Sequence, residues 1–177
     1  MRYSVITISG QLGSGKSTVT KLLSDKLGWM MYSTGQAQRL IAKKYGISTL
    51  ELNQRAISDK SIDDEIDAVF KNPPWGDQPC VVDSRLAFHF LPDSLKVCLR
   101  VTPEVAAERI FRENRALETY DSVAQARDYL QKRRQLEQAH FMKNYNLDIE
   151  RDDLFDLIID SSRLTPDEIC QKIIQYL

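Results

Sequence analysis

The sequence predicts an α/β protein built on a parallel β-sheet, and two observations carry this prediction. Short apolar runs alternate with longer stretches of helical periodicity; the runs are 3–9, 29–33 (the weakest), 79–83, 95–101 and 154–160. Each run is nearly continuous in apolar character, which is typical of strands covered on both faces. With 177 residues, 42% of them apolar and 28% charged, the chain is expected to form a single globular domain.

The composition excludes several classes of protein. The chain has 24 Lys and Arg against 25 Asp and Glu, a net charge of −1. A protein that binds bulk nucleic acid or a membrane surface usually carries a large excess of cations, so neither partner is expected. No apolar run approaches the roughly 20 residues of a membrane span, and the first ten residues contain no signal-peptide core. We therefore expect a cytoplasmic protein.

The three cysteines are predicted to be buried packing residues. They are odd in number and far apart, at Cys80, Cys98 and Cys170, and none lies in a metal-binding spacing. Free cysteine behaves as a small apolar side chain in a reducing compartment. No disulfide and no cysteine-bound metal is expected.

Four helix starts can be predicted from capping signals. Thr102-Pro103 and Thr165-Pro166 each place a hydroxyl before a proline at the first helical position. Glu168 adds the acid of a capping box to the second of these. Ser48 and Ser61 predict two further helix starts.

Two helical insertions interrupt the β/α alternation. The first covers about 36–76 and ends in the loop KNPPWGDQP, whose paired prolines cannot continue a helix. The second covers about 109–145. Neither contains an internal repeat, so we interpret them as excursions from one core, formed by 1–35, 77–108 and 146–177.

Residues 10–17, GQLGSGKS, match the phosphate-binding pattern G-x-x-x-x-G-K-[ST] in full. The match follows a predicted strand and opens a helical stretch, which is the context that this loop requires. Its glycines let successive backbone N–H groups approach phosphate oxygens, and the helix N-terminus adds its positive end. The predicted ATP-binding residues are Gly10, Gln11, Leu12, Gly13, Ser14, Gly15, Lys16, Ser17 and Thr18. A glycine-rich turn without a ligand is the alternative.

Two residues of this loop and one beyond it are candidates for catalysis and for Mg²⁺. Lys16 is expected to contact the β- and γ-phosphates, and the Ser17 hydroxyl to bind Mg²⁺. Asp83 ends the predicted strand 79–83 and is expected to order the metal directly or through water. Alternatively, Asp83 only caps the next helix. The chain has no NKxD-type guanine-reading motif, so a GTPase is not expected.

Beyond the loop, several segments resemble the cytidylate kinases, in particular their short form common in archaea. The segments are ITISGQLGSGKSTVTKLLSDKLGW, YSTGQAQRL, VVDSRLA, RRQLEQAHFMKNYNLDI and IIDSSRLTPDEI, in the order of the family and over nearly the whole chain. The resemblance implies a P-loop NTPase fold of three α/β/α layers. It also implies a five-stranded parallel sheet, a helical insertion that binds a nucleoside monophosphate, and a lid. The implied reaction transfers the γ-phosphoryl group of ATP to CMP or dCMP, with Mg²⁺. Small phosphoryl-transfer enzymes of this type need no partner for catalysis, so we expect a monomer whose partners are its small-molecule substrates.

The resemblance also assigns residues to the acceptor. Thr34, in the Ser-Thr-Gly turn, matches the entry to the acceptor site, and Arg39 matches the arginine that holds the acceptor's phosphate. Arg85 resembles a second arginine that reads phosphate or base. A guanidinium can donate two parallel hydrogen bonds to the oxygens of one phosphate, which explains why arginine suits both positions. A surface salt bridge is the alternative for each.

A third set lies on one predicted helix. Arg133, Glu137 and His140 share a helical face, which in the family offers an arginine, an acid and a second arginine to the acceptor. Here histidine replaces the second arginine, and Ser84 replaces a usual glycine. Because histidine is shorter and often neutral at pH 7, the acceptor remains open between CMP, dCMP, UMP, AMP and a non-nucleotide. A non-kinase NTPase for assembly or switching is the second class of function.

Two charged stretches complete the candidates. Arg109, Arg112 and Arg115 recur every three residues and could neutralise the transferring phosphoryl group, with Arg112 favoured as the catalytic one. A solvated basic face is the alternative for each. A run of four acids, Asp63, Asp64, Glu65 and Asp67, is interpreted as a solvated face of the first insertion. Contact of Asp64 or Asp67 with the base or sugar of the acceptor is the alternative.

Overall fold

The fold is one parallel five-stranded sheet with helices on both faces. The computed structural model describes residues 2–47, 49–113 and 120–177. The strands run in the order β2-β3-β1-β4-β5, and every neighbouring pair is parallel. They are β1 (Val5–Gly10), β2 (Met30–Ser33), β3 (Cys80–Asp83), β4 (Leu95–Arg100) and β5 (Leu157–Asp160). The predicted α/β class and the number of strands are confirmed. The prediction was wrong at the start of the last strand, because Asp152–Leu154 form a short 3-10 helix, η2, instead.

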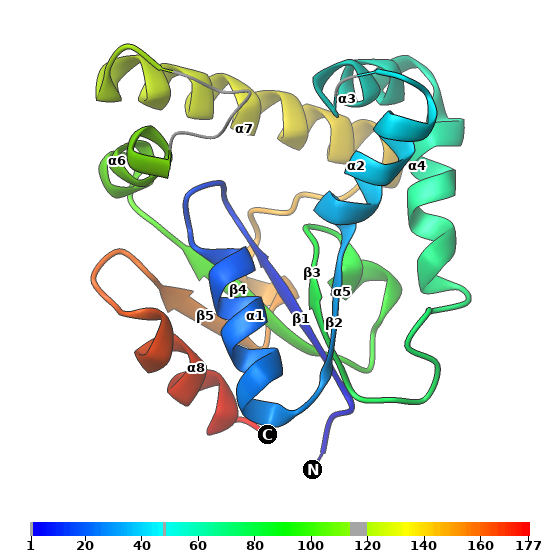
Figure 1. Cartoon of the computed structure of the whole chain (residues 1–177), viewed down its shortest axis with the longest axis vertical. Helices are drawn as coiled ribbons and strands as arrows, with labels where there is room; N and C mark the ends of the chain where they lie inside the picture. Colours follow the sequence, from blue (N-terminus) through cyan, green and yellow to red (C-terminus); the bar gives the residue numbers. More distant parts are fainter. Residues whose placement is uncertain (1, 48, 114–119) are drawn as a thin grey trace.

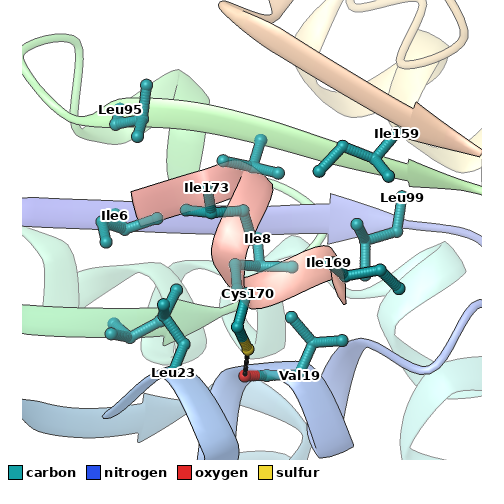
Figure 2. Packing of buried hydrophobic residues seen from close by; sticks show 12 residues of the cluster. Ile6, Ile8, Val19, Leu23, Leu95, Leu99, Ile159, Ile169, Cys170 and Ile173 are labelled. Carbon is teal, nitrogen blue, oxygen red and sulfur yellow. Dashed lines mark hydrogen bonds between the residues drawn. The ribbon is translucent and has the colours of Figure 1, made fainter. Parts of the chain in front are cut away.

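Helices α1 (Lys16–Leu27) and α8 (Pro166–Ile174) cover one face of the sheet. Their apolar side chains meet those of the central strands in a core that contains Ile6, Val97 and Ile173, all fully buried. Figure 2 shows this packing, in which the Cys170 thiol donates to the Val19 carbonyl at 3.8 Å. On the other face, α5 (Ala87–Phe90) and the 3-10 helix η1 (Ala68–Phe70) pack against β3.

The remaining helices lie beyond the carboxyl ends of the strands. Between β2 and β3 the chain forms α2 (Thr34–Lys44), α3 (Thr49–Ser58) and α4 (Lys60–Asp67). Between β4 and β5 it forms α6 (Pro103–Glu113) and α7 (Val123–Tyr145). In Figure 1, α7 crosses the top of the molecule from α6 to α2–α4, while both termini lie at the opposite end. The two insertions therefore lie at the edge of the sheet where strands of α/β proteins present ligand sites.

The capping signals were right at two of the helix starts. The Thr165 hydroxyl and Glu168 form a complete capping box at α8, and α6 begins at Pro103. At α4 the prediction was wrong by two residues: Asp59 is the cap, and its carboxylate accepts from the Ser61 amide at 3.0 Å. Asp59 suits this position because its short carboxylate reaches the exposed amides of the first turn. The start predicted at Ser48 lies outside the described residues.

All three cysteines are buried and free of disulfides, which confirms their interpretation as packing residues. Across the described residues, no helix is long and apolar enough to cross a membrane.

Candidate active site

The loop between β1 and α1 is shaped by three glycines with positive φ. These angles are +140° at Gly10, +77° at Gly13 and +84° at Gly15, in a region that L side chains rarely adopt. A Cβ at Gly10 would lie 2.3 Å from the Leu99 carbonyl oxygen, and one at Gly13 would lie 2.8 Å from the Cα of Ala106. Within the described residues, no side chain caps the N-terminus of α1. Its first amide groups are therefore available to an anion.

The Lys16 side chain curls back over the loop. Its ammonium donates to the carbonyl oxygens of Gly10 at 2.7 Å and Gln11 at 3.0 Å. Burial and, to a smaller extent, the nearby Arg85 guanidinium lower the pKa of Lys16 to about 7, although the carboxylates of Asp83 and Glu137 act in the opposite direction. A lysine held in this way is stabilised in its charged form when phosphate arrives.

Asp83 faces the loop across the carboxyl edge of the sheet. It is buried at the end of β3, level with Ile8 of β1, and its carboxylate accepts from the Ser17 hydroxyl at 2.8 Å. The backbone amides that lead into α5 are instead bound by the Ser84 hydroxyl, which accepts from Leu86 and Ala87. Ser84, and not Asp83, therefore binds the amides at the start of α5.

The paired oxygens of Ser17 and Asp83 suit Mg²⁺. This ion prefers hard oxygen ligands and is usually held by one or two carboxylates, water and substrate phosphates. Across the part of the chain that the structure describes, no group of three or more His, Cys, Asp or Glu side chains could hold a metal. The two residues thus fit a metal that is completed by the nucleotide.

A second cluster joins β3 to α7. The Glu137 carboxylate pairs with the Arg85 guanidinium through one oxygen and accepts from Arg133 Nε through the other, at 3.2 Å. Arg133 also donates to the Tyr129 hydroxyl at 3.3 Å. The side chains of Arg85, Arg133 and Glu137 are 20%, 29% and 21% exposed. Three residues that the resemblance assigned to the acceptor are therefore in contact, as a half-buried cluster next to Lys16.

A small pocket adjoins this cluster and contains two arginines that sequence reasoning missed. Its walls include Gly10 and Gln11 of the loop and the side chains of Arg85, Glu137, Arg100 and Arg134. Arg100 donates to the Glu150 carbonyl at 2.8 Å and to the Asp152 carboxylate at 2.7 Å, and Arg134 pairs with Glu150. Two features of the sequence point to these residues. Arg100 is the last residue of a strand, and Arg134 directly follows Arg133.

His140 contacts the first insertion. Its Nε2 lies 3.1 Å from the Asp63 carboxylate, which also accepts from Asn144 at 2.8 Å. Tyr145, one turn on, donates to the Asp67 carboxylate at 2.6 Å, and burial raises the pKa of Asp67 to about 6. The interpretation of the acidic run as a solvated face was wrong for Asp63, which is buried because α4 packs against the end of α7.

The two residues on α2 lie near the same edge of the sheet. The Thr34 hydroxyl donates to the Asp83 carbonyl at 3.3 Å. Arg39 is exposed, and a Cβ built at Gly35 would lie 3.9 Å from its Nη1, so the side chain runs back along α2 toward Thr34. Its role toward an acceptor stays a prediction, as does that of His140.

The arginines of the second insertion lie in different environments. Arg109 donates to the Gly13 carbonyl at 3.1 Å and to the Ser161 carbonyl at 2.8 Å, so it ties the loop to the end of β5. The Arg112 side chain is 78% exposed and lies 3.6 Å from Glu108 on its own helix. Arg115 lies outside the described residues. Catalysis by Arg112 stays a prediction, and Arg109 is the one of the pair that reaches the loop.

A strand, a loop of positive-φ glycines and a helix that begins at lysine, set where the sheet order reverses, define a protein of the P-loop nucleotide-binding class. Residues 5–163 match the model of the cytidylate kinase-like family, and the chain belongs to this family. The predicted resemblance is thereby confirmed.

Individual relatives agree with this assignment. The chain is 33% identical to a cytidylate kinase of Sulfurisphaera tokodaii, over 98% of this chain and 94% of that protein. It is 35% identical to an S-adenosylmethionine-dependent nucleotide dehydratase of Lacinutrix mariniflava over 97% of this chain, which spans only 35% of that protein. A solved shikimate kinase of Bacteroides thetaiotaomicron superposes with a TM-score of 0.63 at 14% identity, over 97% of this chain and 96% of that one, and shares the fold.

Proposed function

We propose that the protein transfers the γ-phosphoryl group of ATP to the phosphate of CMP or dCMP. The main support for this proposal is that Arg85 and Arg133 both contact the carboxylate of Glu137, close to Lys16. A second anion site thus adjoins the phosphate loop, as a kinase with a phosphorylated acceptor needs. Membership of the cytidylate kinase-like family supports the choice of a cytidine nucleotide.

On the donor side, the loop amides and Lys16 would hold the β- and γ-phosphates of ATP. Ser17 and Asp83 would hold Mg²⁺, which supplies charge neutralisation on the phosphoryl oxygens when it is bound. Arg109 fixes the Gly13 carbonyl, so the loop keeps its shape while Lys16 exchanges its two carbonyl partners for phosphate oxygens.

On the acceptor side, Arg85, Arg133 and Arg39 would bind the monophosphate, with Thr34 at the entry. A phosphate oxygen is already ionised at neutral pH and attacks the γ-phosphorus directly, so no general base is needed. The rate then comes from alignment and from charge neutralisation by Lys16 and the arginines.

The insertions would divide the remaining work. We assign α2–α4 to acceptor binding and α6–α7 to a lid, in a protein that acts as a monomer. Lid closure excludes water, which would otherwise compete with the acceptor. Low ATPase activity without an acceptor is the expected consequence.

A panel of acceptors tests this proposal. The protein is incubated with ATP, Mg²⁺ and one of CMP, dCMP, UMP, AMP or shikimate, and ADP formation is measured. Stimulation by CMP or dCMP is the expected result. Stimulation by another acceptor instead would replace the substrate and keep the reaction, and no stimulation by any phosphoryl acceptor would contradict kinase activity.

A further inference from the structure

The Glu137 carboxylate occupies an unusual position between two guanidinium groups. Each of its oxygens contacts a different arginine, Arg85 from the end of β3 and Arg133 from the preceding turn of α7. The pair with Arg85 joins residues 52 positions apart, so it depends on how α7 lies over the sheet. All three side chains are mostly buried, and the contacts are therefore only weakly screened by solvent.

The charges around this carboxylate are unequal. Arg85 and Arg133 bring two cations to the single carboxylate of Glu137, because the nearby Asp83 carboxylate is directed at Ser17. Buried guanidinium groups need an anion, because a buried charge without a partner is strongly destabilising. Glu137 supplies that anion when no ligand is bound.

A carboxylate presents two oxygens to arginine in much the same way as two oxygens of a phosphate group do. We propose that Glu137 is an internal competitor of phosphate: it occupies the arginine pair until the phosphate of the acceptor displaces it, and so sets the affinity and charge selectivity of the acceptor site. This proposal rests on the proposed function in taking an acceptor phosphate as the displacing ligand.

The displaced carboxylate of Glu137 has space to move toward solvent. Glu137 lies one helical turn from Arg133, and its side chain is about one fifth exposed, so it can turn toward solvent while staying near that arginine. A dianionic phosphate offers more charge to Arg85 and Arg133 than the carboxylate does. A neutral nucleoside offers none, and it cannot release Glu137. The exchange thus favours phosphorylated acceptors over their nucleosides.

The test compares three variants for binding of inorganic phosphate, measured by calorimetry with saturating ADP present to occupy the loop, and for the KM of CMP. Glu137→Gln removes the competing charge, and phosphate is expected to bind about tenfold more tightly. Glu137→Asp keeps the charge but is one methylene too short to span both arginines, so it should also bind phosphate more tightly. Glu150→Gln is the matched control, because it removes one charge from the same pocket without touching Arg85 or Arg133. It should change phosphate affinity less than about threefold.

Several outcomes would overturn the proposal. If Glu137 is a scaffold that holds the arginines in place, both substitutions weaken phosphate binding. If its effect is only general electrostatics, Glu150→Gln tightens binding as much as Glu137→Gln, and Glu137→Asp changes nothing. Should Glu137→Gln fail to fold, as judged by thermal unfolding, Glu137→Asp carries the test alone. Phosphate binding is measured without turnover, so a protein that phosphorylates neither CMP nor dCMP would refute the proposed function, and the binding result could still be interpreted.

Discussion

The phosphate loop and the acceptor-side cluster are built in different ways. The loop lies within eight consecutive residues and is shaped by backbone angles, at Gly10, Gly13 and Gly15. The cluster that we propose for the acceptor draws Arg85 from the segment after β3, Asp63 from α4 and Glu137 from α7, and contacts between their polar side chains hold it together. The loop therefore has its shape from the backbone alone, whereas the cluster depends on contacts between side chains from three separate segments.

Removing the lysine of the loop gives the largest expected effect. Lys16→Ala should reduce the kcat for ATP-dependent phosphorylation of CMP on the order of 10³-fold, because it removes the ammonium that lies against the loop carbonyls and that we propose to contact the phosphates. Lys21→Ala is the control, since Lys21 lies on the same helix, is exposed and pairs only loosely with Asp25. Activity retained by Lys16→Ala would show that the loop is not the donor site. ADP formation is the measurement.

The next largest effect concerns the hydrogen bond between Ser17, which follows the loop glycines, and Asp83 at the end of β3. Asp83→Asn keeps a hydrogen-bond acceptor for Ser17 but removes the charge, so the Mg²⁺ concentration for half-maximal activity should rise about 10- to 100-fold. Because we propose that Ser17 and Asp83 hold one ion, Ser17→Ala added to Asp83→Asn should cost less than the sum of the two single effects. If the two effects add fully in a Mg²⁺ titration, the two residues do not act on the same ion.

The same contrast explains what could be predicted from the sequence. The loop, the strands and the capping box at Thr165 depend on neighbours in the chain, and the structure confirms them. Asp63 was misjudged because its burial depends on α4 meeting Asn144 and His140 of α7, a contact between residues about 80 positions apart. Arg85, Arg133 and Glu137 were named only through family resemblance. Their ion pairs follow from the crossing of α7 over the sheet, which no local pattern encodes.

A smaller predicted effect is that Lys16 takes up a proton when ATP binds. In the free protein the pKa of Lys16 is about 7, so the amine is mostly neutral at pH 8. Phosphate oxygens favour the ammonium form, and ATP binding at pH 8 should take up nearly one proton; the uptake should fall as the pH is lowered below 7. Calorimetry in two buffers with different ionisation enthalpies measures this. Lys16→Arg stays charged throughout and should show no uptake, and equal heats in both buffers for the unaltered protein would refute the linkage.

The smallest effect tests the contact between α4 and α7. Burial raises the pKa of Asp67 to about 6, so the folded protein binds this proton more tightly than the unfolded chain does. The stability that Asp67 contributes is therefore present below about pH 4 and is lost as the pH rises toward 6. Asp67→Asn still accepts from the Tyr145 hydroxyl but has no charge to bury. One pKa unit corresponds to about 1.4 kcal/mol, and partial exposure reduces the expected gain at pH 7.5 to about 1 kcal/mol.

Urea unfolding at pH 5 and pH 7.5 measures the change for Asp67→Asn. The gain should be smaller at pH 5, where the carboxyl of Asp67 is mostly protonated in the folded protein. Asp64→Asn is the matched control, because Asp64 is one turn away on α4, is exposed, and pairs with Lys60 at 3.6 Å. A loss of stability for Asp67→Asn at pH 7.5 would mean that the charge of Asp67 contributes to the contact between the insertions. In that case the acceptor side, unlike the loop, would depend on an ionised acid for its assembly as well as for its selectivity.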